Sequence, residues 1–350
     1  MIIGIPKEIK IFEFRVATSV EAVQKIVELG HTVLIEKSAG LGSGWTDRDY
    51  RVAGAKILSS KRELFKKSDL ILKVKEPQPS EYPLLRPGLI LFTFLHLAAN
   101  KALARVLLKK KVSVIAYENV QTDSGTLPIL APMSEIAGKL APLMGANFLR
   151  KDLGGKGILL SAVGLGGTGH VTILGAGHAG SNALKMAHGL GASISIYDVN
   201  CVKLESLRPQ YSERLQIVSD PSELPEILKR TDLLIGAALI PGKRAPHIAT
   251  TSMVRLMERG SVIIDISVDQ GGCIETTRPT TLKDPVFLKH GVLHCGVTNL
   301  PSLVPRSASE ALCGQTLPYV LKIVRLGLKG ALEADASFKR GLMTEEIIRN

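Results

Sequence analysis

An apolar strand passes directly into a glycine-rich turn in Val171-Thr172-Ile173-Leu174-Gly175-Ala176-Gly177-His178-Ala179-Gly180. The glycines have the spacing G-x-G-x-x-G, and an amphipathic segment continues to about Leu190, which predicts a strand, a tight turn and a helix. In such a turn Gly175 permits the bend, Gly177 lets the backbone approach a pyrophosphate, and Gly180 lets helix and strand pack closely. The first N–H groups of the helix would then face the phosphates.

A second strand, residues 193–197, leads to Asp198, 18 residues beyond the last glycine. Dinucleotide-binding folds carry an acid at about this spacing. A carboxylate there accepts hydrogen bonds from a ribose diol and repels a 2′-phosphate, so the sequence predicts NAD rather than NADP as the cofactor. The alternative is a glycine-rich turn in some other strand–helix–strand unit. The ordered succession of strand, helix, second strand and acid favours the dinucleotide site.

The composition indicates a globular protein with room for two domains. The chain has 350 residues, of which 45% are hydrophobic and 4% aromatic, which suits parallel sheets rich in Val, Ile and Leu. The sequence contains no apolar run of transmembrane length, and residues 1–8 resemble a first strand rather than a signal peptide. The four cysteines form no metal-binding pair. We therefore expect free thiols, no bound metal, no membrane contact and a cytoplasmic protein.

The formal net charge of +12 is compatible with nucleic-acid binding, but the basic residues form no long block. The densest run, Lys109-Lys110-Lys111, lies at the end of a predicted helix, where it forms a solvated face. No aromatic residues alternate with the basic ones to provide a stacking platform. We therefore expect no nucleic-acid partner and assign the charge to attraction of an anionic cofactor and a carboxylate substrate.

Strands and helices alternate along the chain, which predicts α/β architecture with two Rossmann-like, doubly wound domains, parallel sheets and an interdomain cleft. A helix is expected over residues 20–30, where apolar residues at helical spacing end at a glycine. The predicted strands are residues 2–5, 32–36, 70–74, 89–95, 113–117, 171–174, 193–197, 215–218, 233–237, 261–266 and 291–295.

The strands fall into two groups on either side of a helical stretch, residues 133–149. We expect residues 1–130 to form the first part of a substrate-binding, catalytic domain. Residues 131–300 would form the NAD-binding Rossmann domain. Residues 301–350 would return to the catalytic domain as a helical tail, with a helix through 317–328.

Five polar residues follow predicted strands, where open parallel sheets bind their ligands. They are Arg15, Lys75, His96, Asp269 and Asn299. Each has an ordinary structural interpretation when taken singly: the two cations as surface residues, the histidine as a satisfied strand-edge residue, the aspartate as a turn former. Together they suit a small amino or keto acid, which needs a cation for its carboxylate and an acid/base group with a pKa near neutrality.

The chain resembles the alanine dehydrogenase family, which includes the N-terminal region of nicotinamide-nucleotide transhydrogenases. The resemblance spans nearly the whole chain and includes the glycine-rich turn. The other matching motifs cover residues 4–8, 13–17, 73–77, 93–98, 130–138, 236–242, 265–272, 298–301 and 304–306.

The resemblance implies roles for matched residues. Arg15 and Lys75 would bind the substrate, and His96 and Asp269 would form the catalytic pair. It also implies a homo-oligomer, a hexamer as is usual in the family, with L-alanine, pyruvate and ammonium as its small-molecule partners. The residues implied to bind NAD are Ser134, Gly175, Gly177, Gly180, Asp198, Lys203, Ser219, Leu239, Ile240, Ile266, Ser267, Val268, Asp269, Arg278, Val297, Thr298, Asn299 and Leu300.

The function expected from these observations is the NAD-dependent, reversible oxidative deamination of L-alanine. One alternative is a transhydrogenase alpha-type subunit, which binds NAD with the same fingerprint but needs no substrate acid/base. A second is an NAD-binding regulatory protein without turnover. Retention of Arg15, Lys75 and His96 together favours the dehydrogenase. A related enzyme for glycine or serine also remains open, because pockets separate such neighbours only modestly.

Overall fold

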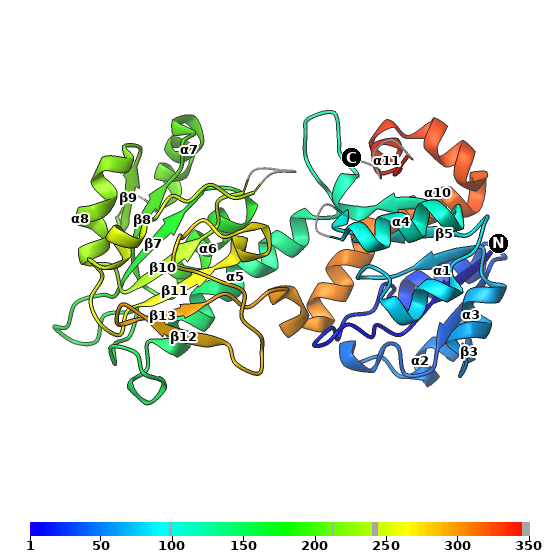
Figure 1. Cartoon of the computed structure of the whole chain (residues 1–350), viewed down its shortest axis with the longest axis horizontal. Coiled ribbons are helices and arrows are strands. Elements are labelled where there is room, and N and C mark those ends of the chain that lie inside the picture. The colour runs from blue at the N-terminus through cyan, green and yellow to red at the C-terminus, as the bar shows by residue number, and fades with distance from the viewer. Residues whose placement is uncertain (98–99, 212, 240–243, 345–350) are drawn as a thin grey trace. The chain divides into compact units, whose positions relative to one another are not determined.

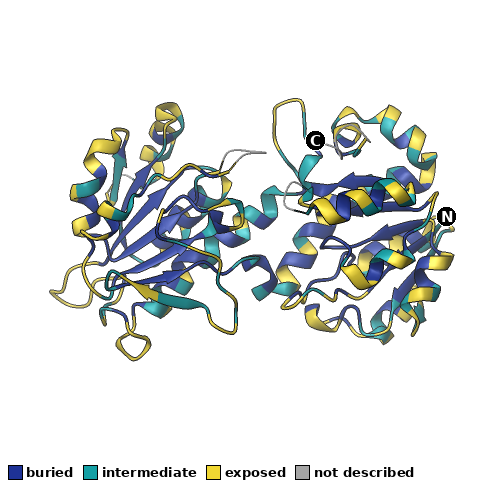
Figure 2. Cartoon of the chain, viewed as in Figure 1, coloured by how far each residue is buried: buried dark blue, intermediate teal, exposed yellow. Residues whose placement is uncertain are grey.

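The computed structural model describes residues 1–97, 100–211, 213–239 and 244–344. Two compact units make up the chain (Figure 1). Unit 1 contains Met1–Met133 and Pro301–Asn350, and unit 2 contains Ser134–Leu300. In both units the strands are largely buried, and many helices have an exposed face (Figure 2). Among the described residues, no helix combines the length and the apolar character needed to cross a membrane.

Unit 1 is built on a six-stranded sheet in the order β3-β2-β1-β4-β5-β6, in which each pair of neighbours is parallel. The order reverses beside β1, which pairs with β2 on one side and β4 on the other. In doubly wound folds, ligands bind at the carboxyl ends of the strands at such a reversal. The strands are β1 (Ile2–Ile5), β2 (Thr32–Glu36), β3 (Lys56–Leu58), β4 (Leu70–Leu72), β5 (Ile90–Thr93) and β6 (Ser113–Ala116).

The helices of unit 1 bury apolar side chains against this sheet. In α1, Ser19 accepts a hydrogen bond from the backbone of Ala22 and so caps the helix start. Ala22, Val23 and Ile26 lie on its buried face at helical spacing. The helices are α1 (Val20–Glu28), α2 (Asp47–Val52), α3 (Lys61–Lys67), α4 (Lys101–Lys110), α10 (Pro305–Ala334) and α11 (Ala336–Arg340), with short 3-10 turns η1 (Leu41–Ser43), η2 (Pro79–Leu84), η4 (Tyr117–Asn119) and η8 (Leu300–Leu303).

Unit 2 contains a seven-stranded sheet in the order β12-β13-β11-β10-β7-β8-β9. Its order reverses beside β7, the strand that leads into the glycine-rich turn. The strands are β7 (His170–Leu174), β8 (Ser193–Tyr197), β9 (Leu215–Val218), β10 (Leu233–Gly236), β11 (Val262–Asp265), β12 (Val286–Lys289) and β13 (Val292–Cys295).

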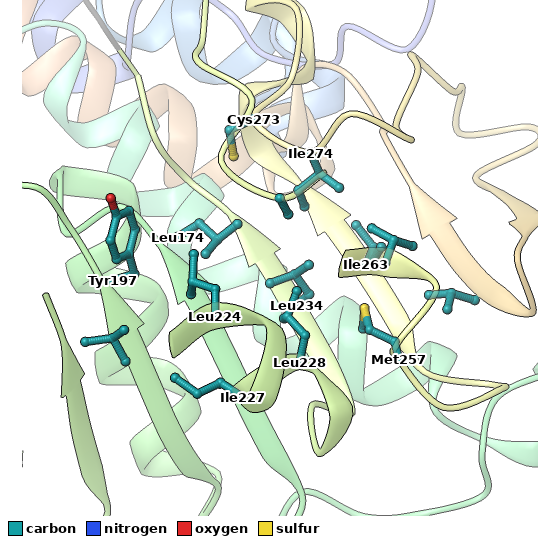
Figure 3. Close-up of a cluster of buried hydrophobic side chains, with 14 of the residues drawn as sticks. Leu174, Tyr197, Leu224, Ile227, Leu228, Leu234, Met257, Ile263, Cys273 and Ile274 are labelled. Atoms are coloured by element: carbon teal, nitrogen blue, oxygen red, sulfur yellow. The ribbon is translucent and has the colours of Figure 1, made fainter. Parts of the chain in front are cut away.

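A cluster of buried apolar side chains joins this sheet to its helices (Figure 3). Leu174, Leu234 and Ile263 come from three neighbouring strands, and Leu224 and Leu228 come from α8. The helices and 3-10 turns of this part of the chain are α5 (Ala131–Phe148), α6 (His178–Gly189), α7 (Cys201–Tyr211), α8 (Leu224–Lys229), α9 (Thr251–Val254), η5 (Lys151–Leu153), η6 (Pro221–Glu223) and η7 (Ile266–Gln270).

Each predicted strand has a counterpart, so the α/β expectation is confirmed, but one pairing departs from the expected parallel sheets. The sequence did not indicate β12, which runs antiparallel to β13. His290 and Gly291 connect them, and both have positive φ, 55° and 81°. Two such residues make a tight hairpin turn, which requires antiparallel strands.

The C-terminal region, expected as a helical tail with a helix through residues 317–328, forms α10 and α11. Helix α10 begins at Pro305, a favoured first helical residue, and its helical assignment runs to Ala334. Gly327 interrupts it with non-helical φ and ψ of 70° and 170°. The expected helix through residues 317–328 thus lies across the junction of two merged helices.

Candidate functional site

The glycine-rich turn after β7 has little room for side chains. Gly175 has a φ of 101°, and its N–H donates to the carbonyl of Tyr197 at 2.7 Å. A Cβ at Gly180 would lie 1.7 Å from the carbonyl oxygen of Gly175. Glycine at these two positions therefore permits the positive φ and the close packing of α6 on the turn.

Gly177 has different surroundings. A Cβ built on it would meet no atom of the described residues within 4 Å, and it immediately precedes the first residue of α6, His178. Helix α5 approaches the same helix start, because a Cβ at Gly138 would lie 2.1 Å from the carbonyl oxygen of Ala179. Ser134 is four residues before Gly138, on the same face of α5. The start of α6 thus combines space beside Gly177 with N–H donors, which suits a phosphate.

Asp198 follows β8 and supports this turn. Its Oδ2 accepts a hydrogen bond from the backbone N–H of Ala176 at 2.6 Å, and its Oδ1 accepts one from Asn200 at 2.9 Å. The predicted ribose-binding acid is therefore also an acceptor for the turn between the first two glycines. Lys203 lies in the first turn of α7, where its N–H donates to Asn200 Oδ1.

The other predicted cofactor residues follow further strands of the same sheet. Ser219 follows β9 and Leu239 follows β10, and both are exposed. Residues 266–269 form η7 directly after β11, and residues 297–300 follow β13. Arg278 places its guanidinium over the ring of Phe287 at 4.5 Å. Ile240 lies outside the described residues.

A buried carboxylate organises the loop that carries Asp269. Asp265 is 1% exposed, and it accepts hydrogen bonds from the backbone N–H groups of Ser267, Cys273 and Ile274 at 3.0, 3.1 and 3.2 Å and from the hydroxyl of Thr277 at 2.7 Å. Burial raises the pKa of the Asp265 carboxyl, and these hydrogen bonds oppose that shift. Asp269 itself is exposed on η7.

In unit 1, the three predicted residues Arg15, Lys75 and His96 follow β1, β4 and β5, which are consecutive neighbours in the sheet. Arg15 is buried and paired with Glu13: Nη2 lies 2.6 Å from Oε2, and Nε lies 2.7 Å from Oε1. Its Nη1 donates to the thioether sulfur of Met133 at 3.1 Å. The structure therefore places the two cations and the histidine at one edge of one sheet.

Lys75 is 9% exposed and is held through its backbone. Its N–H donates to Glu8 Oε1 at 3.2 Å, and its carbonyl accepts from the Thr93 hydroxyl at 3.0 Å. Burial lowers the pKa of the Lys75 ammonium, and the positive charges of Arg15 and Lys10 lower it further. The carboxylates of Glu13 and Glu76 partly offset these effects.

His96 and Asn299 share an unusual backbone conformation, with φ of 48° and 63°. Non-glycine residues in the left-handed region are strained and cluster at functional sites. Glu118 stabilises the strained His96 backbone, because its Oε1 accepts the His96 N–H at 2.7 Å. The imidazole is exposed and stacks on the Phe94 ring with centroids 6.0 Å apart.

The sequence did not predict the contacts of four residues near these two sheet edges, Glu13, Glu118, Asp265 and Met133. Glu13 and Asp265 stand in motifs that were recognised, but nothing in the motif spacing distinguishes a buried hydrogen-bond acceptor from a surface acid. Glu118 acts from the turn after β6, more than 20 residues from the backbone that it holds. Met133 also lies in a recognised motif, residues 130–138, but its contact with Arg15 spans 118 residues of sequence and no local pattern indicates it.

Comparisons with known proteins give a consistent result. Residues 4–137 match the family model for the alanine dehydrogenase/PNT N-terminal domain, and residues 141–347 match the model for the C-terminal domain. The chain is 49% identical over 346 residues to an alanine dehydrogenase of Staphylococcus saprophyticus, covering 98% of this chain and 93% of the relative. It is 47% identical, with the same coverage, to alanine dehydrogenase 2 of Staphylococcus aureus strain USA300.

Two solved structures are similar over almost the whole chain. An L-alanine dehydrogenase matches with a TM-score of 0.95 and 46% identity, covering 98% of this chain and 95% of the other. A transhydrogenase from Sinorhizobium meliloti matches with a TM-score of 0.85 and 28% identity, covering 98% of both chains.

Proposed function

The chain belongs to the alanine dehydrogenase/PNT family, and from this premise we propose that it catalyses the NAD-dependent, reversible oxidative deamination of L-alanine to pyruvate and ammonium. One observation carries the proposal beyond family membership. Two buried or nearly buried cations, Arg15 and Lys75, and the strained His96 lie in the segments that follow three neighbouring strands. That set suits an anionic substrate that also needs proton transfer.

The residues after β7 and β8 fit NAD as the cofactor. The open space at Gly177 and the first N–H groups of α6 would hold the pyrophosphate, with Ser134 beside them. Asp198 would hold the adenosine ribose, which favours NAD over NADP. The other proposed contacts come from Gly175 and Gly180 of the turn and from Lys203, Ser219, Leu239, Ile240, 266–269, Arg278 and 297–300.

In this proposal Arg15 and Lys75 bind the substrate. The guanidinium and the ammonium would bind the carboxylate and the keto oxygen, which fixes the orientation of the substrate's Cα–H bond. Such orientation supplies a large part of many enzymatic rate enhancements. When bound, NAD⁺ provides the acceptor for the hydride that leaves Cα.

His96 would move the protons. As the hydride leaves, the neutral amine of alanine becomes an iminium group, and His96 acts as the general base for attack of water on it. His96 then acts as the general acid as ammonia departs. Asp269 is proposed as the second catalytic group, whose negative charge offsets the positive charge that develops during these steps.

A transhydrogenase-type function is the second candidate, because a transhydrogenase structure matches almost the full chain. Hydride exchange between two nucleotides needs no carboxylate-binding cations and no acid/base for water. The arrangement of Arg15, Lys75 and His96 therefore favours the dehydrogenase. L-alanine is proposed over glycine or L-serine because the similar proteins are alanine dehydrogenases.

The variant His96→Ala tests the proposed acid/base role. We expect NAD binding, measured by calorimetry, to stay close to wild type, and turnover with alanine to fall by roughly 100-fold or more. His31→Ala is the matched control, because this histidine lies in the same unit beside the N-terminus. Near-normal turnover in His96→Ala would remove His96 from the mechanism.

The four cysteines are free thiols, which supports a reducing compartment, and we propose the cytoplasm. From the family we propose a homo-oligomer, a hexamer.

A further inference from the structure

We infer that Glu13 is a positioning residue: its carboxylate holds the Arg15 guanidinium in one orientation and thereby sets how Arg15 meets the substrate carboxylate. The inference rests on the proposed function, because it assigns Glu13 a role through the proposed substrate cation. Glu13 touches no reacting atom in this account.

The contact between the two side chains is a bidentate fork. Glu13 Oε2 accepts from Arg15 Nη2 at 2.6 Å, and Glu13 Oε1 accepts from Nε at 2.7 Å. Oε1 also accepts the backbone N–H of Arg15 at 3.0 Å. Two parallel charged hydrogen bonds fix the plane of a guanidinium as well as its position. The side chains are 2% exposed for Arg15 and 0% for Glu13, so water competes little with this fork.

The backbone around Arg15 is held from other elements. The carbonyl of Phe14 accepts the Ser43 hydroxyl of η1 at 3.2 Å, and the N–H of Val16 donates to Ser309 Oγ of α10 at 3.0 Å. A Cβ at Gly42 would lie 2.3 Å from the Phe14 carbonyl oxygen, so η1 packs directly on this segment. With the backbone fixed on both sides, the bidentate contact with Glu13 fixes the plane of the guanidinium, and the contact of Nη1 with Met133 Sδ adds to it.

Glu13 has a second consequence through charge. Lys75 is flanked by the positive charges of Arg15 and Lys10, and the Glu13 carboxylate partly offsets their lowering of the Lys75 pKa. Other ionisable groups of the described residues near Lys75 include Glu76 and Glu8, which accepts the Lys75 N–H. They also include Lys73, which pairs with Glu8, and His96, which follows the neighbouring strand β5. Without the Glu13 charge, the Lys75 ammonium would lose its proton at a lower pH.

Two substitutions separate orientation from charge. Glu13→Gln keeps the size of the side chain, but it removes the negative charge and turns a donor toward the guanidinium. Glu13→Asp keeps the charge on a side chain shorter by one methylene. Glu81→Gln is the matched control, because Glu81 is also a buried carboxylate of unit 1 but pairs with Lys61 and Lys73, at 3.0 and 3.3 Å.

The measurements are initial rates of NADH oxidation with pyruvate and ammonium over a range of pH. Both Glu13 variants should raise the KM for pyruvate roughly tenfold or more, the loss expected for a misdirected charged hydrogen bond. The kcat should fall by less than the KM rises, and the KM for NADH should stay unchanged. Glu13→Gln should also lower the pH above which the pyruvate KM rises, whereas Glu13→Asp should leave that pH close to wild type.

Glu81→Gln should change none of these kinetic quantities. The inference is overturned if folded Glu13→Gln and Glu13→Asp match Glu81→Gln in pyruvate KM and in pH dependence. If Glu13→Gln does not fold, a wild-type pyruvate KM in Glu13→Asp overturns it. A parallel Arg15→Lys variant distinguishes failure of the proposed substrate role of Arg15 from failure of the inference about Glu13. An unchanged pyruvate KM in Arg15→Lys would remove Arg15 from substrate binding and would overturn the inference with it. A raised pyruvate KM in Arg15→Lys, together with wild-type values in the Glu13 variants, would overturn the inference alone.

Discussion

Gly177 and Gly180 belong to the same glycine-rich turn, yet the structure predicts different effects of adding a methyl group at each. Within the described part of the chain, a Cβ at Gly177 meets nothing within 4 Å, whereas a Cβ at Gly180 would lie 1.7 Å from the Gly175 carbonyl oxygen. Gly177→Ala should therefore fold with a Tm close to wild type and bind NAD more weakly, because the methyl group enters the proposed phosphate space. Gly180→Ala should lose about 1–3 kcal/mol of stability as well as NAD affinity.

Thermal unfolding without cofactor and titration with NAD distinguish the two effects. Undiminished NAD binding by Gly177→Ala would place the pyrophosphate elsewhere. A wild-type Tm for Gly180→Ala would mean that α6 can move away from the turn without cost.

Individual ligand residues could be anticipated from the sequence more readily than the groups that hold them. Arg15 and His96 follow apolar strands, so the position of each could be predicted from the strand pattern. Their supports, Glu13 and Glu118, are acids whose burial and partners depend on the folded loops. Motif spacing alone does not show whether an acid is a surface charge or a buried acceptor.

At the level of elements, two predicted strands end earlier than their apolar runs because carboxylates take their hydrogen bonds. In the run 70–74, the N–H of Val74 donates to Glu8 instead of a neighbouring strand. In the run 89–95, the N–H of Leu95 donates to Glu118. The apolar pattern shows which residues are buried, but it does not show which partner receives each backbone N–H.

Strands β3 and β12 lie at sheet edges and were not predicted from the sequence. Lys56 of β3 and Leu288 and Lys289 of β12 are exposed, and none of the residues in either strand is fully buried. Short edge strands of this kind lack both the continuous apolar run of a buried parallel strand and a clear alternation.

Two buried histidines in the unit 2 sheet make its stability depend on pH. His170 of β7 contacts the hydroxyls of Ser193 and Ser195, and His294 of β13 contacts the Thr276 hydroxyl. Burial lowers the pKa of each to about 4, below the ordinary value of 6.5. The unfolded chain therefore binds more protons between pH 6.5 and 4, so stability falls as the pH falls through this window.

Between pH 7.5 and pH 5 each histidine should cost about 2 kcal/mol of the free energy of unfolding. Urea unfolding at the two pH values measures the loss, and His170→Gln should show a smaller loss than wild type because it removes one titrating group. An equal loss in His170→Gln and wild type would contradict the role of His170.

At the scale of the whole molecule, both units repeat one plan. In each sheet the strand order reverses beside the first strand of the unit, β1 or β7, and the proposed ligand residues follow the strands at their carboxyl ends. The sequence predicted this plan because alternating strands and helices leave few topologies. It did not predict the antiparallel β12, which depends on the two-residue turn at His290 and Gly291.

The most direct test of the proposed function is the rate of NADH formation by the purified protein at alkaline pH. The assay compares L-alanine, glycine, L-serine and no substrate, with NADP⁺ replacing NAD⁺ as a control for the proposed role of Asp198. The account predicts turnover that requires both L-alanine and NAD⁺, with little activity on NADP⁺. Absence of turnover with every amino acid, in a protein that still binds NAD, would contradict it and favour the transhydrogenase-type function.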